Sequence, residues 1–316
     1  AEALATALGD QRRLARVNVY MARPFLVQGE YEQAVTACER NIGAVRTQDN
    51  YDLEVLTTNI LGLAYYHLGN YPKAVEALRR NLVSLDSPMV RERLGGFGLP
   101  FANSRTSLAL ALAARGEFVE ALFRCTEALQ IVEAVGHPFS VTVSYREMGH
   151  LHLRRGDLHQ ATLTLEHALE VCQGVDSPTL FHAVSSALGY AYALSGRSAE
   201  AIPLLEAAAE RPVSSGNNEG QSSRTIWLSE AYLLAGRKAN ALAAAQRALG
   251  LARQHKERGH EAYTLRLLGE IAAREDSLDI GEAENHYRQA LALAVELGMR
   301  PLIAHCHVGL GNLYRP

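Results

Sequence analysis

A short motif of small residues recurs along the chain at an almost constant spacing. Six times, a glycine is followed five residues later by an alanine. The glycines are 40, 47, 40, 40 and 40 residues apart. A period of this length is typical of an array of equal helical units stacked on their neighbours. It replaces the two compact domains that a length of 316 residues would otherwise suggest. The pairs are Gly29 and Ala34, Gly69 and Ala74, Gly116 and Ala121, Gly156 and Ala161, Gly196 and Ala201, and Gly236 and Ala241.

Each unit has the pattern of two helices joined by a tight turn. Seven residues before each glycine lies another small residue, with a large residue directly before it and another three places later, as in Leu188, Gly189 and Tyr192. These places share one face of a helix, and the small residue lets a second helix approach closely. After the turn, apolar residues return at helical spacing, as in 121–132. The pattern predicts an all-α fold, a superhelical solenoid of about seven antiparallel helix pairs.

The period assigns the whole chain, 1–316, to a single solenoid. An insertion at 87–100 lengthens the second unit, and Asp276 stands where the seventh unit would have its glycine. Residues 1–14 have the apolar spacing of the end of a preceding second helix, and 304–316 repeat the pattern of a truncated first helix. We therefore expect the chain to be part of a longer protein. The predicted units are 15–54, 55–101, 102–141, 142–181, 182–221, 222–261 and 262–303.

The segment 62–74 resembles the tetratricopeptide (TPR) repeat. It has the small residue Gly62, the large residue Tyr65 three places later, and then Gly-x-aromatic and Ala in 69–74. The usual TPR unit has about 34 residues, so a period of 40 resembles the variants with longer helices.

A narrower resemblance is to the C-terminal TPR region of bacterial adenylate/guanylate cyclase-like signalling ATPases, carried by 187–197, 267–274 and 286–302. In that family a cyclase domain and an ATPase domain precede the repeats. The resemblance implies that this chain is the non-catalytic sensor or regulatory arm of a larger bacterial signalling protein.

The charge balance and the cysteines exclude several classes of protein. The chain has 31 Lys and Arg against 34 Asp and Glu, a formal net charge of -3, whereas proteins that coat nucleic acid have a large basic surplus. No apolar run is long enough for a membrane span, and the start of the chain lacks the layout of a signal peptide. The four cysteines are widely scattered, which is typical of reduced thiols. We expect a cytoplasmic protein that binds neither nucleic acid nor membranes.

No pattern in the sequence indicates catalysis, a cofactor or a metal. The glycine-rich stretch 95–98 lacks the residue order of a phosphate-binding loop. The pairs His150 and His152, and His305 and His307, are each two residues apart, so on a helix they point in different directions and cannot share one metal ion. No nucleophile motif of the form G-x-S-x-G occurs. We expect this chain to be non-catalytic and to need no cofactor, although the parent protein would be an enzyme.

The concave side of the solenoid is the predicted binding surface. In a TPR superhelix the first helix of each pair lines this side, and certain places on that helix point inward. Arginine together with tyrosine and tryptophan is typical of protein-binding surfaces, although these residues could equally be ordinary solvated or core positions. The candidates are Arg16, Arg23, Asn59, Tyr66, His67, Asn103, Arg146, His150, Tyr190, Glu230, Tyr263, Arg266, Glu270, His305 and Asn312, with Trp227 beside them.

The residues in this groove favour a protein or peptide partner of mixed character. Chaperone-binding TPR proteins grip a C-terminal carboxylate with Lys and Asn at the fifth and ninth places of successive first helices. Here those places hold residues such as Arg146, His150 and Tyr190, so that clamp is not assembled. We expect a peptide or helix with apolar and charged contacts, which belongs either to another protein or to the same polypeptide. The alternatives are a structural module that self-associates and a small-molecule sensor in the bore near His150, Tyr190 and Trp227.

Overall fold

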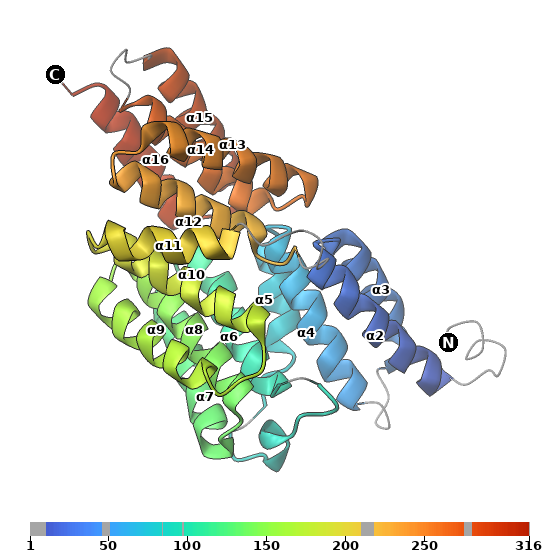
Figure 1. Cartoon of the computed structure of the whole chain (residues 1–316). Coiled ribbons are helices and arrows are strands. Elements are labelled where there is room, and N and C mark those ends of the chain that lie inside the picture. Colours follow the sequence, from blue (N-terminus) through green and yellow to red (C-terminus); the bar gives the residue numbers. More distant parts are fainter. Residues whose placement is uncertain are drawn as a thin grey trace.

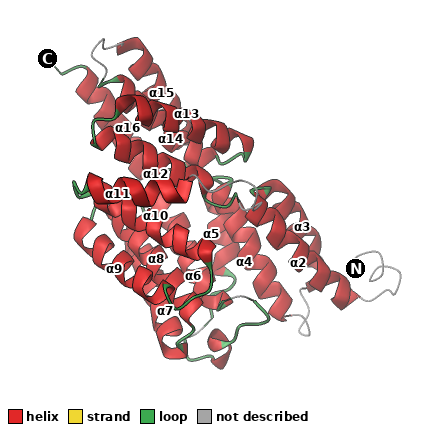
Figure 2. Cartoon of the chain, viewed as in Figure 1, coloured by secondary structure: helices red, strands yellow, loops and turns green. Residues whose placement is uncertain are grey.

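A computed structural model describes residues 11–45, 51–83, 85–96, 98–209, 218–274 and 280–315. Every regular element in these ranges is a helix, and no strand occurs in them (Figure 2). The helices form seven consecutive pairs, followed by α16 (Arg300–Leu313). The pairs are α2 (Gln11–Gln28) with α3 (Tyr31–Val45), α4 (Tyr51–His67) with α5 (Tyr71–Arg79), α6 (Pro100–Ala114) with α7 (Phe118–Val135), α8 (Pro138–Arg155) with α9 (Leu158–Cys172), α10 (Pro178–Leu194) with α11 (Ser198–Ala209), α12 (Gln221–Leu234) with α13 (Lys238–Gln254), and α14 (Arg258–Ala272) with α15 (Ile280–Leu297).

The pairs stack side by side into a superhelix, so the predicted all-α solenoid is confirmed (Figure 1). The first helix of each pair packs against its own second helix and also against the first helices of the neighbouring pairs. The second helices pack mainly on first helices. The first helices therefore form the inner layer of the superhelix and the second helices the outer layer.

The recurring glycines make the tight turns within the pairs. Their φ angles lie between 74° and 80°, in the left-handed region that residues with a Cβ atom disfavour. At Gly69, for example, the next amide, Asn70 N, donates to Tyr65 O across 2.9 Å. The alanine five residues after each glycine is fully buried. The constant spacing of glycine and alanine thus reflects a turn of fixed geometry, followed by a close contact of the second helix with its neighbours.

A second repeated contact joins each unit to the one before it. The tyrosine four residues before the turn glycine donates to a glutamate on the preceding second helix. The distances are 2.5 Å for Tyr65 and Glu39, 2.9 Å for Tyr192 and Glu166, and 2.6 Å for Tyr232 and Glu206. The basic residue after the glycine lies over the ring, with Arg197 3.7 Å from the centroid of Tyr192 and Arg237 4.4 Å from that of Tyr232. This large residue of the repeat therefore fastens neighbouring units together.

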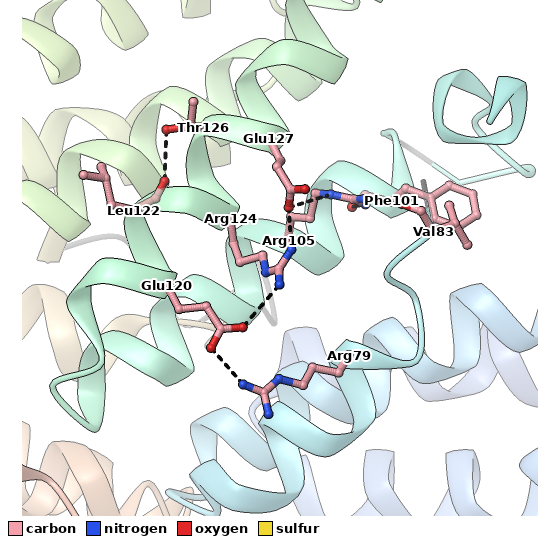
Figure 3. Close-up of polar contacts among 9 residues, drawn as sticks. All are labelled: Arg79, Val83, Phe101, Arg105, Glu120, Leu122, Arg124, Thr126 and Glu127. Carbon is pink, nitrogen blue, oxygen red and sulfur yellow. Dashed lines mark hydrogen bonds and ion pairs between the residues drawn. The ribbon is translucent and has the colours of Figure 1, made fainter. Parts of the chain in front are cut away.

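The longer second unit contains an irregular segment, 80–99, with one short 3-10 helix, η2 (Pro88–Arg91). Arg105, which is 1% exposed, anchors it: Nη2 donates to Val83 O at 2.6 Å and Nη1 to Phe101 O at 3.2 Å (Figure 3). The Arg105 guanidinium also lies 3.4 Å from the carboxylate of Glu127. Figure 3 shows this pair continuing outward through Arg124 and Glu120 to Arg79.

Several predicted boundaries need correction. Residues 11–14, expected to end a preceding helix, belong to α2, and the rest of that predicted helix, 1–10, is outside the described residues. Helix α16 begins at Arg300, because Gly298 ends α15 with φ 70° and Pro301 occupies the first turn of the new helix. Asp276 lies outside the described residues.

Three further features of the described chain bear on membrane insertion, disulfide bonds and metal binding. None of its helices combines the length and hydrophobicity that a bilayer span requires. All four cysteines are buried and unpaired, as predicted. Within the described ranges, no three His, Cys, Asp or Glu side chains are grouped so that they could hold a metal ion.

The small residue of the repeat gives a prediction about stability. A Cβ atom at Gly149 would lie 2.5 Å from Cγ of Leu165, whereas one at Gly250, inside α13, would meet nothing within 4 Å. Gly149→Ala should lower the free energy of unfolding by about 1–3 kcal/mol, because the two helices of the pair must separate. Gly250→Ala should raise it by up to about 1 kcal/mol, through helix propensity. Thermal unfolding of both variants checks this, and equal effects would contradict the close packing described here.

Candidate functional site

The inner layer closes on itself where one superhelical turn meets the next. Tyr31 Oη donates to Glu257 Oε1 at 2.8 Å, between residues 226 apart in sequence. At a period of 40 residues, that separation is between five and six units. We call this line of contact the seam. Other contacts along it join Asn218 N to Val27 O (2.8 Å), His255 Nδ1 to Gly29 O (3.1 Å), Lys256 Nζ to Glu32 Oε2 (2.5 Å) and Arg300 Nε to Arg115 O (2.6 Å).

Glu257 is the centre of the seam on its inner side and is only 1% exposed. Besides Tyr31, two histidines approach it: His67 Nδ1 lies 3.7 Å from one carboxylate oxygen and His260 Nδ1 3.3 Å from the other. The His67 ring stacks on Tyr31 with centroids 4.5 Å apart. Burial would raise the pKa of the Glu257 carboxyl, but the two histidines outweigh it and hold the pKa well below its usual value. The seam thus depends on a buried carboxylate shared by both superhelical turns.

A buried arginine fills the bore next to the seam. Arg154 donates from Nη1 to Tyr263 Oη at 2.7 Å and from Nη2 to Tyr66 Oη at 3.4 Å, and its guanidinium lies 5.4 Å from the centroid of the Tyr263 ring. Tyr71 packs beside them, against the backbone of Gly259. Burial lowers the pKa of Arg154, but the surrounding phenol groups reverse this and raise it overall. These residues come from the first and second superhelical turns, so they fasten the two turns together.

Farther along the bore lies a ladder of aromatic and charged side chains. His150 meets the Trp227 ring edge-on at 5.2 Å, and Trp227 stacks on Tyr190 at 5.2 Å. Tyr190 Oη donates to Glu230 Oε2 at 2.9 Å. Burial, reinforced by the Glu230 charge, raises the pKa of the Tyr190 phenol. Each side chain of this ladder belongs to a different first helix or to the next turn of the same one.

The ladder ends in a paired arginine. Arg266 Nη2 lies 3.2 Å from Glu230, and Nη1 donates to Glu270 at 2.7 Å. Burial lowers the pKa of Arg266, yet the two carboxylates more than reverse it and the pKa is raised. The guanidinium is therefore neutralised within the protein.

At the other end of the ladder, Glu147 is buried between two basic side chains. Its carboxylate accepts from Arg146 Nη2 and lies 3.0 Å from His150 Nδ1. Burial would raise the pKa of Glu147, but Arg146 and His150 lower it to about 2. Glu147 directly precedes Met148 of the repeat pattern. Nothing in that pattern predicts a charged side chain that points inward at this place.

The residues predicted for the groove divide into three groups. Most of them line the bore and contact one another: Tyr66, His67, Arg146, His150, Tyr190, Trp227, Glu230, Tyr263, Arg266 and Glu270. Asn59 instead binds Ser104 at 3.1 Å between packed helices, and Asn103 is half-buried beside Gly98. Arg16, His305 and Asn312 are exposed, and Arg23 is half-exposed.

Sequence analysis missed several bore residues, namely Tyr31, Glu147, Arg154, Glu257 and His260. The contacts of Tyr31 and Glu257 depend on the superhelical pitch, which brings together residues 226 apart. Arg154 lies two residues before a turn glycine, at a place where other units have no arginine. Its role becomes visible only in the folded structure, where it lies next to the tyrosines of the bore.

The cluster around Arg154 leaves little free space beside it. The cavity lined by Tyr66, Arg154, His260 and Tyr263 has a volume of about 10 Å³, which is roughly that of one water molecule. A larger hollow of about 370 Å³ lies on the outer layer, where Val119 and Phe123 of α7 are exposed. A peptide in the bore would therefore have to displace protein side chains or widen the superhelix.

Comparison with known families supports the repeat assignment. A family model described as tetratricopeptide repeat matches residues 56–80, 102–122 and 182–207. In these three segments the chain matches the tetratricopeptide repeat. Each matched segment covers parts of the two helices of one pair. No curated protein matches the sequence.

Several solved structures have a similar fold. The Rap conjugation gene regulator of plasmid pLS20, in complex with the Phr* peptide, is 12% identical with a TM-score of 0.62, over 95% of this chain and 89% of that one. PlcR of Bacillus thuringiensis, in complex with the peptide PapR7 and DNA, is 16% identical with a TM-score of 0.53, over 68% and 74%. At these identities the likeness shows the fold alone.

A third similar structure is longer than this chain. It is a signal transduction ATPase with numerous domains and a TPR sensor, from Pyrococcus horikoshii. It is 14% identical with a TM-score of 0.54, and the match covers 98% of this chain but only 45% of that one. The TPR array described here therefore spans less than half of that protein.

The buried Glu147 gives a prediction about pH. Since its folded pKa of about 2 lies below the ordinary 4.5, the carboxylate stabilises the fold above pH 4.5 and loses this contribution as the pH falls toward 2. Glu147→Gln should lower the free energy of unfolding by roughly 3 kcal/mol near pH 6, and the difference from wild type should shrink below pH 4.5. Glu170→Gln, at an exposed acid on α9, is the control and should change little at any pH. A difference for Glu147→Gln that is constant with pH would refute the buried ionised carboxylate.

Proposed function

We propose that this chain is a non-catalytic protein-interaction module that binds a peptide segment in its bore. The observation that carries the proposal is the ladder on the inner layer, where His150, Trp227 and Tyr190 stack beside Glu230 and Arg266. Aromatic rings and arginines are the side chains that contribute most of the energy in protein interfaces. Here they line the concave side of the superhelix.

Binding in this bore requires the superhelix to widen. The cavity beside the Arg154 cluster is about 10 Å³, so an extended peptide has no room at this level in the closed arrangement. Widening would break the seam contacts of Glu257 and Lys256 first, because they join the two superhelical turns directly. The seam therefore sets the free energy that a bound peptide must supply.

The comparisons agree with a peptide partner. The Rap and PlcR structures are complexes with peptides, and their folds match this one at TM-scores above 0.5. PlcR is also bound to DNA, whereas the net charge of -3 in this chain favours a protein partner. A small-molecule sensor would need a pocket of about 300 Å³ or more, whereas the cavity beside Arg154 is about 10 Å³.

We further propose that the module is the sensor arm of a larger bacterial signalling protein. The Pyrococcus horikoshii ATPase supports this role, because its TPR repeats are described as a sensor and this chain matches only 45% of its length. Opening of the seam on peptide binding would be the movement passed to neighbouring domains.

A peptide-capture experiment tests the proposal. A soluble library of random hexapeptides is passed over the immobilised chain, and retained peptides are sequenced by mass spectrometry. Wild type should retain a defined subset, and Trp227→Leu should lose it, by about tenfold in affinity or more. The control is Phe123→Ala, which removes an aromatic ring that is 56% exposed on the outer layer and should leave capture unchanged. Capture that is absent in wild type, or equal in Trp227→Leu, would count against binding in the bore.

A further inference from the structure

Arg146 on α8 and Arg224 on α12 each lie about one helical turn before the contact between His150 and Trp227. His150 on α8 and Trp227 on α12 are in ring contact at 5.2 Å. Arg146 lies four residues before His150, and Arg224 lies three residues before Trp227. Because α8 and α12 are both first helices and run in the same direction, each arginine is one helical turn from that contact, on the same side of it. The two guanidinium groups therefore occupy one level of the bore.

In both arginines, at least one N–H group makes no hydrogen bond to the protein. Arg146 donates from Nη2 to Glu147, while its Nε is buried and has no hydrogen-bond partner. Arg224 donates from Nη1 to the backbone oxygen of Glu219 at 3.1 Å, and its Nε is also buried without a partner. No ion pair joins Arg224 to a carboxylate in the part of the chain that the structure describes. Arg266 in the same bore also has a buried Nε without a partner, but it differs from Arg224 because it is paired with two carboxylates.

The local electrostatics agree with this geometry. Burial lowers the pKa of Arg224 and the charge of Arg146 lowers it further, while the charges of Glu219 and Glu257 and the phenol of Tyr31 offset this only in part. A buried charge without a full counter-charge destabilises the fold that contains it. Arg224 is thus a cation that the protein positions in its binding bore without neutralising it.

We propose that Arg146 and Arg224 form a receptor for a carboxylate of the bound peptide. A carboxylate accepts several hydrogen bonds at once, and two guanidinium groups present the forked N–H donors that match it. The carboxylate can belong to an acidic side chain or to the C-terminus of the peptide. This inference rests on the proposed function, because the site lies inside the bore that the peptide would enter.

The first test needs no ligand. Arg224→Met removes the uncompensated charge and should raise the melting temperature by about 2 °C or more. Arg266→Met, the matched control on α14, leaves Glu230 and Glu270 unpaired and should lower the melting temperature. If Arg224→Met destabilises the protein as much as Arg266→Met does, the charge of Arg224 is already compensated and the inference is wrong.

The second test uses four libraries of N-acetylated random hexapeptides, with and without Asp and Glu, each made with a free C-terminal carboxylate or a C-terminal amide. Wild type should retain peptides that carry a carboxylate at least about tenfold more strongly than neutral amidated ones. Arg224→Gln should abolish that preference. Arg155→Gln, at an exposed arginine on α8, should keep it. The library that is retained tells whether a side chain or the chain end supplies the carboxylate.

The outcomes separate this inference from the proposed function. Equal retention of neutral and acidic peptides by wild type would overturn the carboxylate receptor and leave peptide binding intact. Retention that Arg224→Gln does not change would do the same. Retention of no library by wild type would contradict both.

Discussion

The contact between successive superhelical turns is the constraint on which the rest of this structure depends. A solenoid is held mainly by contacts between neighbouring units, and an open superhelix would leave its inner layer in water. Here the pitch brings Tyr31 against Glu257, across 226 residues of sequence. This adds long-range contacts to a fold that would otherwise have local ones, and it turns a groove into a closed bore.

Closure explains the unusual chemistry of the interior. Charged groups such as Glu147, Arg154 and Glu257 are taken out of water, which is costly unless each finds partners. Most of them do: Arg154 has two tyrosines, Glu257 has Tyr31 and two histidines, and Arg266 has two carboxylates. Such networks stabilise one conformation of the bore. They lose much of their stabilising free energy when one side chain moves away. A closed bore of this kind can act as a two-state element, closed on its own side chains or open to a peptide.

Much of the fold could be predicted from the sequence, because its cause is local. The turn glycines with positive φ and the buried alanines recur in every unit from Gly29 to Gly236, so their spacing was sufficient to give the helix pairs. The inward places of the first helices also identified Tyr190, Glu230 and Arg266. The sequence pattern could not show that these residues pair with each other, or that Asn59 packs between helices. Those facts depend on the curvature of the whole array, to which every unit contributes a small rotation.

The separation of the two sides of the seam tests the central claim most directly. Nitroxide labels can be attached at positions 32 and 256 through Glu32→Cys and Lys256→Cys, at exposed residues whose side chains lie 2.5 Å apart, while the four native cysteines are buried. Pulsed electron paramagnetic resonance then measures the distance between the labels in the free protein. A closed bore predicts a single short distance with a narrow distribution. A broad distribution centred at long distances would show that the turns do not meet, and would contradict the account.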